Sequence, residues 1–176
     1  MRRDVPHHDE FLTLIEAHQR ALLKVCWAYG RSPHDRDDLL QEIIAQLWKA
    51  FERYDRSRKF STWMFRVALN VAIDHRRRQR RWGRTATPLD LSEVDPATSD
   101  EGDQKRQQLR DLWELLEQQS EVDRAIVVLL LEGSSHREIA EALGLSESNV
   151  GTRLNRLKKS LRQSFQEQPD TPRESL

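Results

Sequence analysis

Residues 60–81 read FSTWMFRVALNVAIDHRRRQRR and predict one long helix that ends in a cluster of arginines. At 3.6 residues per turn, one side of this helix is apolar and consists of Met64, Val67, Ala68 and Val71. Another side is polar and carries Thr62, Arg66 and Asn70, with Trp63 beside them. The cluster consists of Arg76, Arg77, Arg78, Arg80 and Arg81. Positive charge at this position complements the negative pole of a helix C-terminus.

This combination of side chains is typical of a helix that binds nucleic acid. Polar groups can contact base edges, an aromatic ring can stack on a base, and arginines can bind phosphates, particularly on an unpaired strand. The same pattern also fits a helix that packs into a core and ends in a solvated basic segment. Residues 60–81 alone leave both interpretations open.

Charge is segregated along the chain although its total is balanced. The 176 residues include 29 Lys+Arg and 29 Asp+Glu, so affinity for nucleic acid would have to come from local positive charge. Residues 76–84 contain six arginines, whereas residues 85–104 contain six acidic residues and neither lysine nor arginine. Residues 85–104 also contain two prolines and no apolar periodicity, which predicts a flexible acidic linker.

This linker divides the chain into two parts, each rich in helical patterns. We therefore predict an all-α fold of two small helical domains, residues 1–84 and residues 105–165. A polar tail at residues 166–176 has no interpretable pattern and is expected to be disordered.

Composition and motifs argue against several other classes of protein. No apolar run approaches the roughly 20 residues of a membrane span, so we expect a cytoplasmic protein without membrane insertion. The single cysteine, Cys26, lies in an apolar run and is expected to be a small buried hydrophobe in a reducing compartment. The sequence contains no Walker motif, metal-ligand spacing or nucleophile–base arrangement. We therefore expect no catalytic residue, no metal and no cofactor, and the chain is not expected to be an enzyme.

Two amphipathic helices are predicted before residue 60. The first is capped by Asp9, covers residues 10–29 and ends at Gly30. The second covers residues 35–54, and its expected buried residues are Leu40, Ile43, Ile44, Leu47 and Phe51. Its other side carries Asp37, Asp38, Gln41 and Glu42. That acidic patch is either a solvated face or a docking surface for a basic partner.

Residues 54–59, YDRSRK, predict a loop that leads into the helix of residues 60–81, with Ser61 as its cap. Tyr54 and Phe60 bracket the loop. Aromatic rings beside arginines can form a pocket for a flipped-out base, and they can equally be ordinary core residues.

The C-terminal part contains the most specific local pattern in the chain. Ser135 and Glu138 form an S-x-x-E capping box, Gly144 is placed to end that helix, and Ser146 is placed to cap the next. The second of these helices has an apolar stripe of Val150, Leu154, Leu157 and Leu161. Its opposite side is polar and carries Ser148, Thr152, Asn155, Arg156 and Lys159.

This arrangement predicts a helix-turn-helix, in which small Ala140 permits close crossing and the second helix enters the major groove. Asn155 and Arg156 have side chains suited to adenine and guanine edges respectively. Phosphate contacts are expected from Lys158, Lys159 and Arg162. A purely structural helical hairpin is the alternative. Gly151 weakens the second helix by about 0.5–1 kcal/mol relative to alanine, which indicates either close approach of a DNA backbone or a tolerated weak position.

Nearly the whole chain, from Glu10 to Arg162, resembles the bacterial RNA polymerase sigma factors of the extracytoplasmic-function (ECF) type. Three segments carry the resemblance: DDLLQEIIAQLWKAF (residues 37–51), FSTWMFRVALNVAIDHRRR (residues 60–78) and HREIAEALGLSESNVGTRLNRLKKSL (residues 136–161). Their order and spacing are more specific than any one of them. Two departures are Gly151, where many relatives carry lysine or arginine, and Tyr54, which is often phenylalanine.

The resemblance implies three binding surfaces and no catalysis. Core RNA polymerase would be bound, through the clamp helices of its largest subunit, by Asp38, Leu40, Gln41 and Glu42. The minus-ten promoter element would be read and melted by Tyr54, Phe60, Ser61, Trp63, Asn70, Arg76 and Arg77. The minus-thirty-five element would be read by Ser148, Thr152, Asn155, Arg156 and Lys159. An anti-sigma factor is a further partner that the resemblance implies.

The sequence therefore predicts a specificity subunit that binds core RNA polymerase, directs it to promoter DNA and assists promoter melting. The main alternative is a stand-alone helix-turn-helix transcriptional regulator, which would bind duplex DNA without polymerase. A second alternative is an RNA-binding adaptor, which would bind RNA alone.

Overall fold

The computed structural model describes residues 5–81 and 116–166, and every regular element in these two ranges is an α-helix. The N-terminal part consists of α1 (Val5–Ala17), α2 (Gln19–Tyr29), α3 (Pro33–Phe51) and α4 (Phe60–Arg81). The C-terminal part consists of α6 (Glu121–Leu131), α7 (His136–Leu143) and α8 (Glu147–Gln166). The predicted all-α class is confirmed. The expected linker at residues 85–104 lies outside the described residues, as does the tail beyond residue 166.

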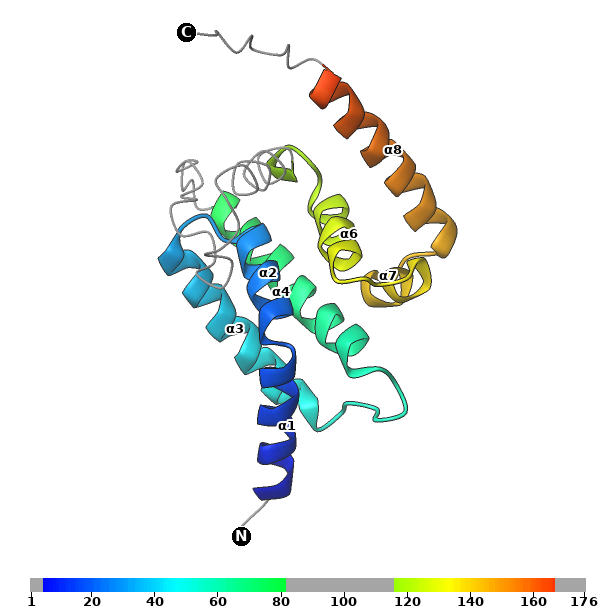
Figure 1. Cartoon of the computed structure of the whole chain (residues 1–176). Coiled ribbons are helices and arrows are strands. Elements are labelled where there is room, and N and C mark those ends of the chain that lie inside the picture. The colour runs from blue at the N-terminus through cyan, green and yellow to red at the C-terminus, as the bar shows by residue number, and fades with distance from the viewer. Residues whose placement is uncertain (1–4, 82–115, 167–176) are drawn as a thin grey trace, which may run out of the picture.

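The N-terminal helices form a bundle against which the C-terminal helices pack. In Figure 1, α2, α3 and α4 run antiparallel in succession, α6 and α7 lie against α2 and α4, and α8 forms the outer edge. Buried apolar residues of all these helices belong to one continuous cluster. Cys26 lies within it, and burial raises the pKa of its thiol to about 12, so the cysteine is a buried hydrophobe as predicted.

The first predicted helix is in fact two helices. It begins earlier than expected, at Val5, so the expected cap Asp9 lies inside α1. Pro6 is tolerated in the first turn because backbone N–H groups there have no partner within the helix. The helix then breaks at His18, which has φ −115° and ψ 10° and whose ring nitrogen Nδ1 lies 2.8 Å from the carbonyl oxygen of Leu14.

The second helix is shifted toward the N-terminus relative to the prediction. Ser32 caps α3 by accepting a hydrogen bond from the Asp35 amide at 3.2 Å, and Pro33 occupies the first helical position. The buried stripe of α3 includes Leu39, whereas Leu40 lies half-buried at its edge. The helix ends at Phe51, three residues before the predicted end.

The helix of residues 60–81 has the predicted ends but a different buried face. It begins at Phe60, so Ser61 lies in its first turn and is not its cap. Thr62, expected on the polar side, is buried, whereas Arg66 and Asn70 are exposed as expected. Within the described residues, no helix is both long and apolar enough to cross a membrane.

Candidate nucleic-acid interface

The helix-turn-helix has the geometry that its sequence predicts. The Ser135 side chain accepts a hydrogen bond from the Glu138 amide, and the Glu138 carboxylate accepts one from the Ser135 amide at 2.8 Å. Gly144 ends α7 with φ 66°, a left-handed conformation that glycine adopts without a steric penalty. Ser146 then accepts a hydrogen bond from the Asn149 amide at the start of α8.

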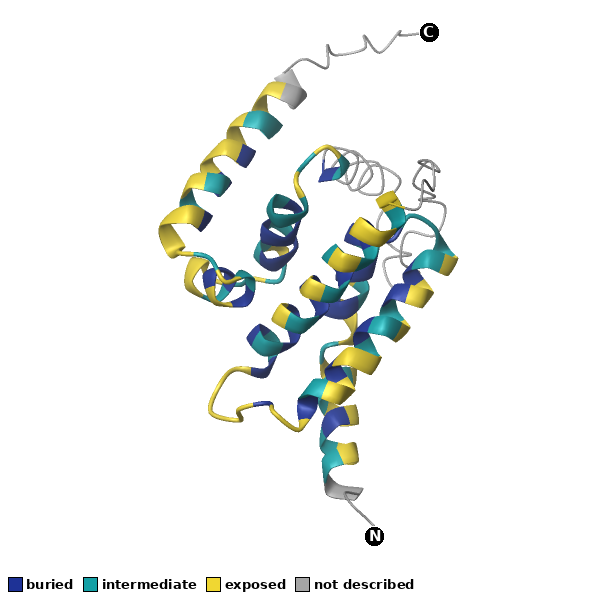
Figure 2. Cartoon of the chain, turned by 180° about the vertical axis from the view of Figure 1, so that it is seen from behind, coloured by how far each residue is buried: buried dark blue, intermediate teal, exposed yellow. Residues whose placement is uncertain are grey.

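The two sides of α8 are clearly separated. Val150, Leu154 and Leu157 are buried against the rest of the C-terminal part. The residues predicted to read DNA are all exposed: Ser148, Thr152, Asn155, Arg156 and Lys159. Figure 2 shows the exposed side of α8 as a continuous outer stripe. Such a stripe on the second helix of a helix-turn-helix can enter a major groove without unpacking the fold.

Arg153 anchors α8 against α6 and was not singled out by its sequence. Its guanidinium donates to Asp123 of α6 at 2.8 Å and to Asn149 of its own helix at 2.9 Å. The side chains of Arg153 and Asp123 are 26% and 20% exposed. The pair fixes the rotation of α8 against α6 and so sets which residues face outward.

Gly151 is expected to be a weak position and not a packing requirement. A Cβ atom added there would meet nothing within 4 Å. We expect Gly151→Ala to raise the free energy of unfolding by about 0.5–1 kcal/mol, because alanine has less backbone freedom to lose. Urea unfolding followed by circular dichroism measures the change. Gly144→Ala is the matched control and should destabilise the protein, because its φ is +66°. Gly151→Ala variants that bind DNA less tightly despite greater stability would indicate close approach of a DNA backbone.

The aromatic residues around the predicted base-capture loop form a cluster. Tyr54 is 9% exposed, and its hydroxyl donates to the Arg58 carbonyl at 2.7 Å, which closes the loop on itself. The Trp63 ring lies 4.9 Å from that of Tyr54 and 5.5 Å from that of Phe60. Phe60 is buried, while Ser61 and Trp63 are half-buried. These residues lie together, with Tyr54 and Phe60 buried in the cluster and Trp63 the most accessible of the three rings.

The arginine cluster of α4 is divided between the interior and the surface. Arg76 is 2% exposed, and both of its terminal nitrogens lie 3.3 Å from the Glu117 carboxylate. Burial lowers the pKa of Arg76, and Glu117 partly offsets that effect. In this arrangement Arg76 cannot reach a ligand, whereas Arg77 and Asn70 are exposed.

The loop before α4 is held on two sides by ion pairs that the sequence did not reveal. Arg56 donates to both carboxylate oxygens of Glu10 in α1, at 3.0 and 2.6 Å. Arg58 pairs with Glu141 at 2.9 Å, and Lys59 pairs with Glu138 at 2.7 Å, both in α7. The loop therefore contacts the helix-turn-helix directly.

The acidic face of α3 has fully exposed members and members that contact α4. Asp38 and Gln41 are exposed. Glu42 is half-buried and accepts a hydrogen bond from Arg78 of α4 at 2.5 Å, while its other oxygen lies 3.2 Å from His75 Nδ1. Of the predicted polymerase-binding carboxylates, Asp38 is thus the accessible one, and Glu42 ties α3 to α4.

His75 lies between two carboxylates of α3, which favour its doubly protonated form. Its Nε2 lies 2.8 Å from Asp35 and its Nδ1 3.2 Å from Glu42, so both ring nitrogens can donate. The hydrogen bond to Asp35, opposed by burial and reinforced by Glu42, raises the pKa of His75. Gln79 also contacts Asp35 and His75.

The contacts of His75 with Asp35 and Glu42 predict that the stability of the fold depends on pH. The folded pKa of His75 exceeds the unfolded value of about 6.5, so its contribution is complete below that pH and is lost as the pH rises through the folded pKa. Urea titrations from about pH 6 to pH 9 should show the wild type losing stability that His75→Gln does not lose. The exposed His136→Gln variant should follow the wild type. Parallel curves for wild type and His75→Gln would contradict the assignment.

Among the described residues, no group of three or more His, Cys, Asp or Glu side chains could hold a metal ion. The exposed side chains described above can bind a partner through hydrogen bonds, charge and ring stacking.

Comparison with known proteins matches both parts of the chain. The sigma-70 region 2 family model matches residues 14–82, and the sigma-70 region 4 model matches residues 109–161. The RNA polymerase sigma factor NccH of Alcaligenes xylosoxydans xylosoxydans is 28% identical over 86% of this chain and 84% of its own length. The ECF RNA polymerase sigma factor SigX of Bacillus subtilis is 27% identical over 90% of this chain and 84% of its own length.

Two solved structures share the fold. CnrH, in complex with the cytosolic domain of CnrY, superposes with a TM-score of 0.68 at 24% identity and covers 92% of this chain and 90% of its own. RpoE of Bartonella quintana, in complex with the anti-sigma factor NepR, superposes with a TM-score of 0.71 at 18% identity. That match covers 90% of this chain and 98% of RpoE.

Proposed function

Because the chain belongs to the bacterial RNA polymerase sigma factors of the extracytoplasmic-function type, we propose that it binds core RNA polymerase, directs it to specific promoters and assists in opening them. The observation that carries the proposal is the presence of both sigma-70 regions, in order, in one chain. A stand-alone helix-turn-helix regulator has no use for region 2 and is not favoured.

The proposed mechanism uses binding free energy alone. Asp38 and Gln41 of α3 contact the clamp helices of the polymerase largest subunit, and their exposure supports this role. Asn70, Arg77 and the loop before α4 bind the non-template strand of the minus-ten element. Capture of unstacked bases there shifts the duplex toward its open form. The exposed side of α8 holds the minus-thirty-five element at a fixed distance upstream.

We propose that residues 1–84 bind polymerase and the minus-ten element, and that residues 105–165 bind the minus-thirty-five element. An anti-sigma factor is the proposed inhibitor, since the fold is shared with RpoE, which was solved with the anti-sigma factor NepR. The proposed location is the cytoplasm, where core polymerase and promoter DNA are found.

In vitro transcription tests the proposal most directly. The purified chain is added to core RNA polymerase and fragmented DNA from the source genome, and transcript starts are mapped. We expect a small set of starts that share two sequence elements and that require the chain. Failure to direct initiation at any start, or DNA binding of full specificity without polymerase, would reject the proposal.

The recognition helix gives a residue-level prediction. Asn155→Ala and Arg156→Ala should each cost about 1–3 kcal/mol of binding to the upstream element and relax the preference at one base position. Lys158→Ala should instead weaken binding evenly across sequences, because a phosphate contact carries no sequence information. Transcription from promoters randomised in the upstream element measures both effects. If Asn155→Ala and Arg156→Ala both keep the base preference of the wild type, α8 does not read this element.

A further inference from the structure

Arg56, in the loop before α4, contacts two side chains of α1. Its Nε donates to one carboxylate oxygen of Glu10 at 3.0 Å and its Nη2 to the other at 2.6 Å, which makes a two-point contact. Nη2 also lies 3.1 Å from Nδ1 of His7. A guanidinium has only donors, so His7 Nδ1 accepts this hydrogen bond. Two residues of α1, one turn apart, therefore hold one residue of the loop.

The same turn of α1 contacts the aromatic cluster from which the loop emerges. The Phe51 ring centroid lies 4.8 Å from that of His7 and 5.7 Å from the guanidinium carbon of Arg56. The rings of Phe51 and Tyr54 are stacked, with 5.9 Å between their centroids and an angle of 16° between their planes. In Figures 1 and 2, the end of α3 lies against α1. The helix α1 thus contacts both the loop and the ring on which Tyr54 stacks.

Hydrogen bonds within the loop fix its shape more than its orientation. The Tyr54 hydroxyl donates to the Arg58 carbonyl at 2.7 Å, and the Ser57 amide donates to the Asp55 carboxylate at 2.9 Å. These contacts join loop residues to one another. Residues 55–59 are all exposed, so little packing holds them against the fold. Their orientation depends on contacts with other elements, and Glu10 supplies one.

The contact between Glu10 and Arg56 is better suited to orienting the loop than to stabilising the fold. The two side chains are 38% and 50% exposed, and an ion pair at such exposure adds little stability. Two parallel hydrogen bonds between planar groups nevertheless fix their relative geometry. The hydrogen bond from Arg56 lowers the pKa of Glu10, which keeps the carboxylate charged at neutral pH.

We propose that Glu10, assisted by His7 and acting through Arg56, is a positioning residue that holds the loop in the orientation that selects one unstacked base of the minus-ten element. The inference rests on the proposed function, because it concerns the loop that binds the non-template strand. A preorganised loop discriminates between bases by its fixed shape, whereas a loosened loop adapts to several bases. His7 and Glu10 precede residues 14–82, which the region 2 model matches, so they extend the predicted set of minus-ten residues.

Base discrimination by the polymerase complex tests the role of Glu10. Each base of the minus-ten element of a promoter mapped with the wild type is changed in turn, and initiation rates are compared. We expect Glu10→Ala to lose roughly tenfold in discrimination at one base position, a magnitude typical of coupled residues in contact. Glu16→Ala makes the same chemical change at an exposed position further along α1 and should discriminate as the wild type does. Unchanged discrimination in Glu10→Ala would overturn the proposal.

A double-mutant cycle shows whether Glu10 acts through Arg56. In the Arg56→Ala background, Glu10→Ala should change discrimination no further, because the group that it positions is absent. Glu10→Gln keeps one oxygen acceptor and should lose less than Glu10→Ala. An effect of Glu10→Ala that persists at full size without the Arg56 side chain would overturn the positioning role.

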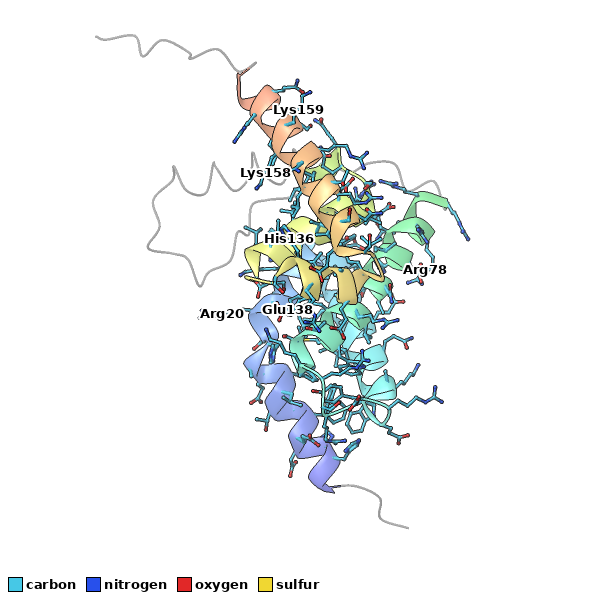
Figure 3. All side chains as sticks on the ribbon, turned by 90° about the vertical axis from the view of Figure 1, so that its right-hand side faces the viewer. Arg20, Arg78, His136, Glu138, Lys158 and Lys159 are labelled. Atoms are coloured by element: carbon cyan, nitrogen blue, oxygen red, sulfur yellow. The ribbon has the colours of Figure 1, made fainter. Side chains whose placement is uncertain are left out.

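The upstream element provides an internal control on the same templates. Figure 3 shows Lys158 and Lys159 on α8, at the end of the molecule opposite α1. We therefore expect Glu10→Ala to leave the preference at the upstream element and the midpoint of urea unfolding unchanged. Loss of preference at both elements would indicate general damage to the fold and would overturn the positioning role.

A distance measurement on the free chain tests the orientation of the loop without polymerase. Spin labels are placed at Ser57→Cys in the loop and Asp74→Cys in α4, two exposed positions, while buried Cys26 should stay unlabelled. Phe60 and Asp74 are separated by about 21 Å of helix, a span suited to pulsed electron resonance. We expect Glu10→Ala to broaden the distance distribution and Glu16→Ala to leave it narrow. Equally narrow distributions would overturn the inference.

The failure of this inference can be separated from that of the proposed function. Promoter-specific initiation by the wild type, together with unchanged base discrimination in Glu10→Ala or an unchanged loop distance, would reject only the positioning role. Absence of promoter-specific initiation by the wild type would reject the proposed function, and base selection by the loop with it.

Discussion

Asp38→Lys combined with Gln41→Ala should lower the affinity for core RNA polymerase by about 2–5 kcal/mol, the range measured when a close interfacial charge pair is broken. Asp38 and Gln41 lie one turn apart on the exposed side of α3. The contact of Asp38 with His34, at 3.8 Å, is exposed and adds little stability, so the loss should appear in binding and not in stability. Competition for core polymerase against a labelled sigma factor measures the affinity, and circular dichroism checks the fold.

Glu42 is left unchanged in this variant because it joins α3 to α4. The sequence alone suggests Asp38→Lys with Glu42→Lys as the docking test. Glu42, however, bonds Arg78 and faces His75, so a lysine there would place three cations together and loosen α3 from α4. Glu16→Lys is the charge-matched control, because it makes the same change as Asp38→Lys on exposed α1. Core affinity equal to that of Glu16→Lys would reject the docking surface.

Features set by neighbouring residues were predictable from the sequence. The capping box of Ser135 and Glu138 and the left-handed Gly144 depend on a few adjacent residues, and both occur as predicted. The apolar stripe of α8 was equally readable, because helical period alone decides which residues share a side. The exposed side of α8 followed from that stripe.

Features set by residues distant in sequence were not predictable. The break at His18 is accompanied by a ring contact with Phe60, and no local breaker residue marks it. Arg76 resembles its exposed neighbours in sequence, and only Glu117 and the packing of α6 against α4 account for its burial. Arg124 is an extreme case, because it is a lone arginine in an apolar helix and is nevertheless buried. Its guanidinium donates to the carbonyls of Ala28, Leu116 and Glu117.

For the same reason, the sequence predicted only part of the structure of the loop before α4. Its aromatic residues were recognised, but the ion pairs with Glu10, Glu138 and Glu141 join segments that are far apart in the chain. These pairs hold the loop against α1 and α7. They are tertiary contacts, which one sequence does not specify.

Phe51→Ala should lower the free energy of unfolding by about 3–5 kcal/mol, because it empties a fully buried aromatic site. Phe51 lies at the centre of the aromatic cluster, with ring centroids 5.1 Å from Phe11, 5.9 Å from Tyr54 and 6.1 Å from Trp63. Since it touches the rings that shape the loop, its loss should also impair promoter opening. Urea unfolding measures the stability, and Phe51→Leu, which keeps most of the volume, should cost less.

The functional consequence can be separated from general instability by a matched core variant. Leu154→Ala removes a buried residue of α8 and should cost about 2–5 kcal/mol, but its effect should fall on the upstream element. A promoter template with a pre-opened minus-ten region should restore initiation by Phe51→Ala and not by Leu154→Ala, because melting is then no longer required. Equal rescue of both variants, or a stability loss below about 1 kcal/mol for Phe51→Ala, would show that the aromatic cluster does not shape the melting surface.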